Sequence, residues 1–129
     1  MISYRLAHPG GEYNRLYALM KREEDGLKVP LGWPTVVAEE NGRVVGFLST
    51  HKVAGALLAG PLVIEGSHRP WVFIRLVEAY ETVLRAAGVT VYAFRVDKSN
   101  EKQVERLDRL GIERISEGDT FISYKRELK

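Results

Sequence analysis

The pair Asn41-Gly42 constrains the fold more than any other feature of the chain. The two residues of a tight hairpin turn need positive φ angles, which Asn and Gly adopt at low cost. A β-branched run precedes the pair over Thr35–Ala38, and a mostly apolar run follows it over Arg43–His51. The sequence therefore predicts two antiparallel strands joined by this turn.

Other strands and helices are predicted on both sides of this hairpin. Helical spacing of apolar residues predicts helices that begin near Tyr13, at Pro70 and at Ser99 or Asn100. Gly88 and Gly111 are placed to end the second and third helices. Alternating or continuous apolar runs predict further strands over residues 2–7, 56–64, 89–96 and 120–125. Pro30, Gly32 and Pro34 predict that Leu27–Pro34 is a loop or one short helical turn. The order β α β β β α β α β predicts a mixed sheet with helices packed on it.

Length and composition fit one soluble domain over residues 1–129, which we expect to be cytoplasmic. The net charge of +2 comes without a basic cluster, and the sequence has no cysteine. Disulfide scaffolds, thiol nucleophiles and zinc fingers are therefore excluded. The 3 histidines have no metal-ligand spacing, so no metal site is expected. Val53–Ile64 is too short to cross a membrane.

Three stretches give the chain a resemblance to the GNAT superfamily of acyl-CoA-dependent N-acetyltransferases. TVVAEENGRVVGFLSTH (Thr35–His51) resembles the second and third strands of that family. GPLVIEGSHRPWVFIRLVEAYETVLRAAG (Gly60–Gly88) resembles its fourth strand, cofactor loop and next helix. VYAFRVDKSNEKQVERLDRLGIERI (Val91–Ile115) resembles its fifth strand and an Asn-started helix that ends in Leu-Gly. The resemblance implies an α/β fold with a mostly antiparallel sheet that splays between strands 4 and 5.

The same resemblance implies a site for acetyl-CoA as co-substrate. Pro61 would lie at the splay, where the pantetheine chain would run along the edge of Leu62, Val63 and Ile64. A backbone N–H would hold the acyl carbonyl. The pyrophosphate would lie at the start of the helix near Pro70. Further contacts to the cofactor are expected from His68, Arg69, Trp71, Val72, Phe73 and Asn100.

Two positions depart from the family pattern. Trp71 and Phe73 stand where the cofactor loop usually has small residues, and Pro70 removes one N–H donor. Leu107 stands where many members carry a tyrosine as general acid. The alternative hypothesis is therefore a catalytically degenerate binding or regulatory module, with the CoA site filled by Trp71 and Phe73. Such a module would dock a partner or form a homodimer through strand edges.

The enzyme hypothesis needs a group that removes a proton from a primary amine. Glu65 follows the fourth strand and is one candidate; Glu40, acting through water, is another. The acceptor would be a small molecule or a protein. Weaker candidates are Glu39 and His51 for the base, Trp33 for an acceptor pocket, and Tyr80, Tyr92 and Tyr124 for the missing acid.

Nucleic-acid binding is a further hypothesis that we consider weak. It rests on Lys102, Arg106, Arg109 and Arg114. Glu101, Glu105 and Asp108 interleave with these cations along the sequence, which is typical of a solvated, salt-bridged helix face.

Overall fold

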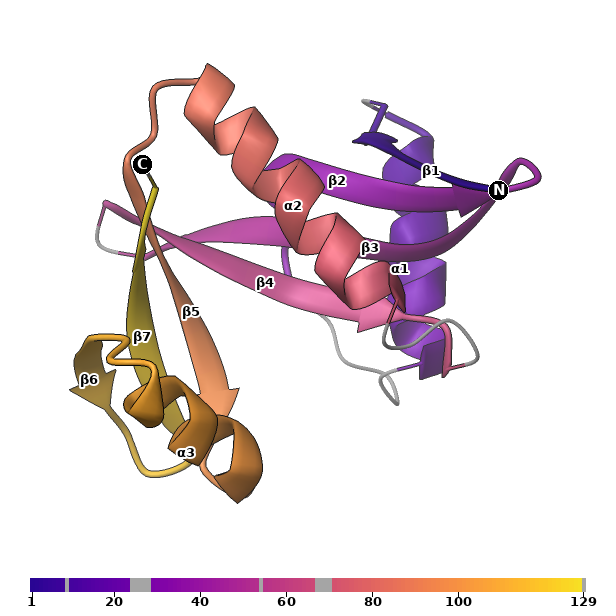
Figure 1. Cartoon of the computed structure of the whole chain (residues 1–129). Coiled ribbons are helices and arrows are strands. Elements are labelled where there is room, and N and C mark those ends of the chain that lie inside the picture. The colour runs from indigo at the N-terminus through magenta and orange to yellow at the C-terminus, as the bar shows by residue number, and fades with distance from the viewer. Residues whose placement is uncertain (9, 24–28, 54, 67–70, 129) are drawn as a thin grey trace.

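The computed structural model describes residues 1–8, 10–23, 29–53, 55–66 and 71–128. Seven strands form one sheet in the order β1-β2-β3-β4-β5-β7-β6 (Figure 1). The strands are β1 (Ile2–Leu6), β2 (Gly32–Glu40), β3 (Arg43–Val53), β4 (Ala56–Ile64), β5 (Val91–Asp97), β6 (Arg114–Glu117) and β7 (Phe121–Glu127). The helices are α1 (Glu12–Glu23), α2 (Trp71–Ala86) and α3 (Glu101–Arg109).

The predicted hairpin is confirmed. Asn41 has a φ of 52° and Gly42 a φ of 78°, and Glu40 lies opposite Arg43. Every pair of neighbouring strands is antiparallel except β4 and β5, which run parallel. The connection between these two strands is α2, as a parallel pair requires a crossover. The mixed, mostly antiparallel sheet is therefore the predicted one.

The helices lie on both faces of the sheet. On one face, α1 buries Leu16 and Met20 against Val37 and Phe47. On the other face, α2 packs with Val36, Leu48 and Tyr92, and α3 packs with Val96 and Ile122. Tyr92, Phe94 and Val96 alternate along β5 and so project from one face. It follows that α2 and α3 share that face, with α2 over the β2–β4 side and α3 over the β5–β7 side (Figure 1).

Local signals set the ends of the helices. The side chain of Asn100 caps α3 by accepting a hydrogen bond from the N–H of Gln103 at 3.4 Å. Gly111 has a φ of 75°, and the next residue, Ile112, donates to the carbonyl of Leu107. Gly88, with a φ of 80°, ends α2 in the same way. These are Schellman ends, for which glycine is suited because it lacks a Cβ.

Two predictions about the strands were wrong. Leu27–Pro34 was predicted as a loop or one helical turn, but β2 begins at Gly32; residues 27 and 28 lie outside the described residues. A register shift between Gly32 and Val36 accommodates Pro34 inside a strand that would otherwise exclude it. The other error is β6, which the sequence did not predict. All four of its residues are exposed, so it has no alternation between buried and exposed positions that a pattern could detect.

Candidate active site

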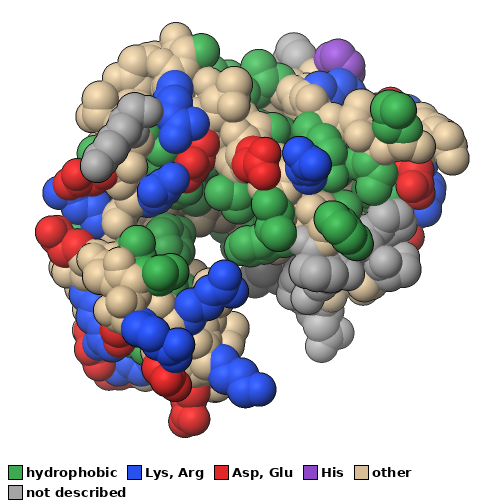
Figure 2. All heavy atoms as spheres, in the orientation of Figure 1, with side chains coloured by type: hydrophobic (Ala, Val, Ile, Leu, Met, Phe, Trp, Pro, Cys, Tyr) green, Lys and Arg blue, Asp and Glu red, His purple; other side chains and the backbone are tan. Residues whose placement is uncertain are grey.

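The sheet opens between β4 and β5. Leu58 lies opposite Ala93 and Ala59 opposite Phe94, and beyond these two pairs the described strands diverge. Gly60-Pro61 follows the last paired residue of β4, where we predicted the distortion. Figure 1 shows β4 and β5 separating on either side of the gap, and Figure 2 shows that side chains leave it hollow. The predicted splay is therefore present, and we call it the β4–β5 opening.

One edge of the opening carries backbone groups of β4. The N–H of Glu65 donates to the carbonyl of Val45 on β3 at 2.8 Å. Because backbone groups alternate in direction along an antiparallel strand, those of Val63 also face β3, whereas those of Leu62 face β5. Leu62 lies beyond the last described pair with β5. Its N–H and carbonyl are thus directed into the opening.

The side walls of the opening are apolar on the α2 side. Glu81 of α2 contacts Tyr92 of β5, so the flank of α2 that carries Glu81 faces β5. Phe73 and Val77 precede Glu81 by eight and four residues and lie on the same flank. Phe94 packs against the clusters under both α2 and α3, and so lies between the two helices. Figure 2 shows hydrophobic side chains along this side of the hollow.

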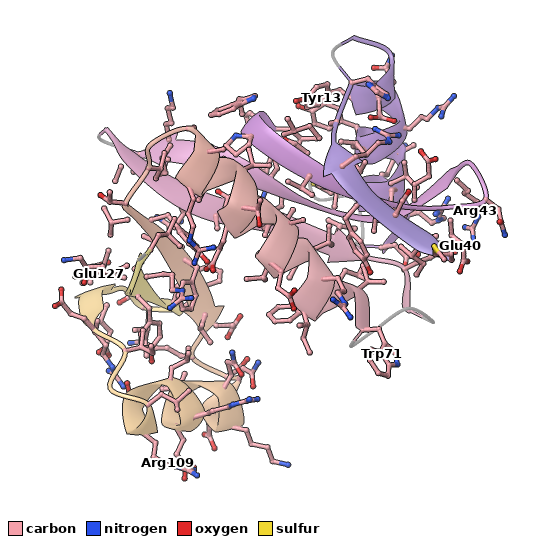
Figure 3. All side chains as sticks on the ribbon, turned by 45° about the horizontal axis from the view of Figure 1, so that its top comes forward. Tyr13, Glu40, Arg43, Trp71, Arg109 and Glu127 are labelled. Carbon is pink, nitrogen blue, oxygen red and sulfur yellow. The ribbon has the colours of Figure 1, made fainter. Side chains whose placement is uncertain are left out.

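The predicted cofactor residues at the start of α2 differ in how far their side chains are exposed. Val72 is fully buried, with Leu76 one turn later, and both face the core. Trp71 is 75% exposed and Phe73 is 42% exposed. Figure 3 shows Trp71 pointing outward from the end of the helix. His68 and Arg69, which we also predicted to contact the cofactor, lie outside the described residues, as does Pro70.

The predicted bases lie at the hairpin end of the sheet. Nη1 of Arg43 donates to both carboxylate oxygens of Glu65, each at 2.7 Å. This contact raises the pKa of the Arg43 guanidinium. Glu40 lies next to Arg43 across the turn, as Figure 3 shows. Glu65 is three residues beyond Leu62, roughly 10 Å along the strand, so it reaches the opening only through water.

The three tyrosines considered as general acids each form a hydrogen bond with another side chain of the protein. The Tyr80 hydroxyl lies 2.6 Å from Oγ1 of Thr50, and the Tyr92 hydroxyl donates to Glu81 at 2.6 Å. Burial raises the pKa of both tyrosines. Tyr124 donates to Asp108 at 3.3 Å. Leu107, which we aligned with the acid position of the family, lies on α3 and is buried against Val96 and Ile122.

At the closed end of the opening lies a polar cluster in which Thr50, Tyr80, Glu81 and Tyr92 are buried and Arg126 is exposed. Besides Tyr92, Glu81 accepts hydrogen bonds from Nε and Nη2 of Arg126 on β7 at 2.9 and 3.2 Å. Burial alone would raise the pKa of Glu81, but the hydrogen bonds from Arg126 and Tyr92 outweigh it and lower that pKa. Adjacent residues of α2 thereby bind β3 on one side and β5 and β7 on the other.

Arg95 is a candidate that sequence reasoning missed. It follows Phe94, the last described residue of β5 that pairs with β4, and its side chain is exposed. Because Phe94 and Val96 face α3, Arg95 projects from the opposite face of the sheet. The alternation in Tyr92-Ala93-Phe94-Arg95-Val96 would have revealed this placement. Arg95 therefore places a positive charge on that face, beside the point where β4 and β5 part.

Neither a metal-binding cluster nor a membrane-spanning helix is found among the described residues. Within that part of the chain, no group of three His, Cys, Asp or Glu side chains is placed to hold a metal ion. Of the described helices, none has the length and apolar character needed to cross a membrane.

Comparisons with known proteins agree on the fold. No family model matches the sequence, and no curated protein matches it. A probable acetyltransferase from Staphylococcus epidermidis superposes with a TM-score of 0.76 at 10% identity, covering 100% of both chains. A GNAT-family acetyltransferase from Staphylococcus aureus has a TM-score of 0.73 at 12% identity over 100% of both chains.

A third similar structure was solved with a ligand. The PaiA N-acetyltransferase from Thermoplasma acidophilum, in complex with coenzyme A, has a TM-score of 0.73 at 10% identity, covering 99% of both chains. Together with the splayed parallel pair of β4 and β5, these similarities show that the chain has the fold of the GNAT-family acetyltransferases.

Proposed function

We propose that the protein is an N-acyltransferase that moves an acetyl or related acyl group from acyl-CoA to a primary amine. The observation that carries the proposal is the β4–β5 opening, into which Leu62 directs a backbone N–H. A fixed N–H in an apolar cleft stabilises the oxyanion that develops when an amine attacks an acyl carbonyl. The coenzyme A complex of the Thermoplasma protein supports the choice of acyl donor.

In this proposal the acyl-CoA enters from the face that carries α2 and α3. Its pantetheine chain runs along Leu62, Val63 and Ile64 between the apolar walls formed by Phe73 and Phe94. Val72 anchors the start of α2, and Trp71 lies at the rim. Asn100, His68 and Arg69 contribute polar contacts toward the nucleotide end. Placing thioester and amine in one cleft removes much of the entropic cost of bringing them together.

The amine acceptor enters from the opposite face, past Arg95. Its nitrogen attacks the acyl carbon, and collapse of the tetrahedral intermediate breaks the C–S bond. The proton from nitrogen passes through water to Glu65, which its ion pair with Arg43 keeps in place. Glu40 lies at the same end of the sheet and serves as the second candidate. The thiolate leaves without a dedicated acid, because the conjugate base of a thiol with a pKa of about 8.5 is an adequate leaving group.

Thermal unfolding with and without ligand tests the donor. Acetyl-CoA at 100 times its Kd should stabilise the protein by about 2.7 kcal/mol, which raises Tm by several degrees. Free CoA should act similarly, and ADP serves as the control for a nucleotide alone. An unchanged Tm with acetyl-CoA and CoA would contradict the proposal.

The role of Glu65 is tested by Glu65→Gln. If the carboxylate accepts the amine proton, transfer to an amine acceptor under saturating acetyl-CoA should slow about 100-fold. Glu105→Gln is a matched control, because Glu105 also pairs with an arginine but lies on α3. A rate equal to that of the wild type would assign proton removal to solvent or to Glu40.

The alternative is a degenerate module on the same fold. It is favoured by Trp71, an exposed aromatic residue where small residues would admit phosphate. In that case Trp71 and Phe73 would close the cofactor site and dock a partner, including a second copy of the chain. This alternative predicts no Tm shift with any CoA species.

A further inference from the structure

The charges of α3 are sorted onto two flanks. Along the sequence acidic and basic residues alternate, but each residue of a helix is rotated by about 100° from the one before. With Leu107 directed at the sheet, Glu101, Glu105 and Asp108 fall on one flank. Lys102 and Arg106, one helical turn apart, fall on the other. We call this pair the basic flank. The interleaved pattern in the sequence therefore conceals a helix with two differently charged sides.

The acidic flank faces β6, at the outer edge of the sheet. Asp108 accepts a hydrogen bond from Nε of Arg114 on β6 at 3.0 Å. Glu101, Glu105 and Asp108 also line an open hollow together with the cations Lys98 and Arg109. Lys98 in turn pairs with Glu117 of β6 at 2.9 Å. This side of α3 is thus occupied by ion pairs with its own neighbours.

The basic flank therefore faces the β4–β5 opening. Lys102 and Arg106 are both exposed, and within the described part of the chain neither forms an ion pair. Figure 2 shows Lys and Arg side chains along the lower border of the hollow, across from the hydrophobic side chains of the upper border. One border of the opening is apolar and the other is cationic.

We propose that Lys102 and Arg106 bind the phosphate groups of the nucleotide end of acyl-CoA. This inference rests on the proposed function. The cleft matches the donor, which is apolar and amide-bearing along its pantetheine chain and strongly anionic at the other end. The start of α2 lacks the small residues that let phosphate approach backbone N–H groups, since Trp71 and Phe73 stand there. A guanidinium and an ammonium on α3 supply charge-assisted hydrogen bonds in their place.

A compact anion fits this flank better than a nucleic acid does. Two cations within one helical turn match a diphosphate or a phosphomonoester. An extended polyanion would continue past them onto the acidic flank of the same helix, where Lys98, Arg109 and Arg114 already pair with carboxylates. The ligand class is therefore a nucleoside phosphate linked to an apolar arm.

The test is calorimetric titration of the full chain with CoA, acetyl-pantetheine, ADP and inorganic phosphate. The double variant Lys102→Gln/Arg106→Gln should raise the Kd for CoA at least about tenfold, which corresponds to about 1.4 kcal/mol. The Kd for acetyl-pantetheine, which has no phosphate, should not change. Arg15→Gln/Lys21→Gln on α1 removes the same charge from exposed positions on the other face and should leave CoA binding unchanged.

The outcomes separate this inference from the proposed function. If wild-type protein binds CoA and the double variant binds it equally well, the basic flank is not the phosphate site and the transferase proposal stands. An equal loss of CoA affinity in the α1 control would show that the change in net charge alone causes the effect, and would overturn the inference. If wild-type protein binds neither CoA nor acetyl-pantetheine, both proposals fail. Binding of inorganic phosphate as tight as that of CoA would make the flank a general anion site and overturn the assignment to CoA.

Discussion

The two ends of the β4–β5 opening differ in how their polar groups are satisfied. At the closed end, the polar cluster of Tyr80, Glu81, Tyr92 and Arg126 is largely buried, and each member bonds to another part of the protein. At the open end, Lys102, Arg106 and the backbone of Leu62 face solvent across the gap. The polar groups of the closed end bond within the protein, whereas Lys102 and Arg106 at the open end form no ion pair with another described residue.

This difference explains how the sheet tolerates a split. Only two described residue pairs join β4 to β5, so the ladder contributes little to holding the two halves together. The adjacent residues Tyr80 and Glu81 of α2 compensate, because one bonds to β3 and the other to β5 and β7. We therefore infer that the closed end stabilises the fold, and we propose that the open end binds the ligand. Substitutions at the two ends should therefore separate folding from ligand affinity.

The largest expected effect on folding is that of Glu81→Ala. Removal of this carboxylate leaves the Tyr92 hydroxyl buried without its acceptor and Arg126 without its partner. We expect a loss of about 2–3 kcal/mol in the free energy of unfolding, measured by urea denaturation. Glu78→Ala, on the exposed side of α2, is the control and should change it by less than about 0.5 kcal/mol. Equal losses in the two variants would show that the polar cluster at the closed end does not contribute more to stability than an exposed ion pair does.

A second, smaller effect concerns pH. The pKa of Glu81 is lower in the folded protein than its ordinary value of 4.5. Its stabilising contribution is therefore present above about pH 4.5 and is lost as the pH falls through the folded-state pKa. Urea denaturation of wild-type protein and Glu81→Gln across this range should show a steeper loss for the wild type. Parallel curves would contradict the role assigned to the Glu81 carboxylate.

The smallest expected effect is that of Trp71→Ala, at the open end. The indole is 75% exposed and points outward, so the free energy of unfolding should change by less than about 0.5 kcal/mol. The Kd for CoA should change less than in the variant that lacks Lys102 and Arg106. A large drop in stability would mean that Trp71 packs as part of the fold, and the contrast between the two ends would weaken.

The fold could be predicted largely from local signals. Asn41-Gly42 fixed the hairpin, Asn100 and the two glycines after α2 and α3 fixed helix ends, and Gly60-Pro61 marked the distortion. The residues of β6 and the start of β2 carried no such signal. One strand is exposed on both faces, and the other contains a proline that depends on a register shift.

The site was less accessible to sequence reasoning because it depends on which way side chains face. Phe73 could be placed near the cofactor by resemblance alone, but its position on the wall of the opening follows from the contacts of Glu81. Arg95 and the basic flank were missed for a related reason. Their placement depends on the divergence of β4 and β5 and on the residues that contact the other side of α3. Both are features of the tertiary structure and leave no local pattern in the sequence.

The short strand β6 has a consequence for the behaviour of the protein at high concentration. An exposed sheet edge is a template on which another chain can add a strand and begin to aggregate. Here the edge is only four residues long, and its pairing with β7 is interrupted by a register shift between Arg114 and Ser116. Arg114 and Glu117 place opposite charges on it, bonded to each other and to α3. A short, charged and irregular edge of this kind is one of the ways in which natural sheets limit pairing with another chain.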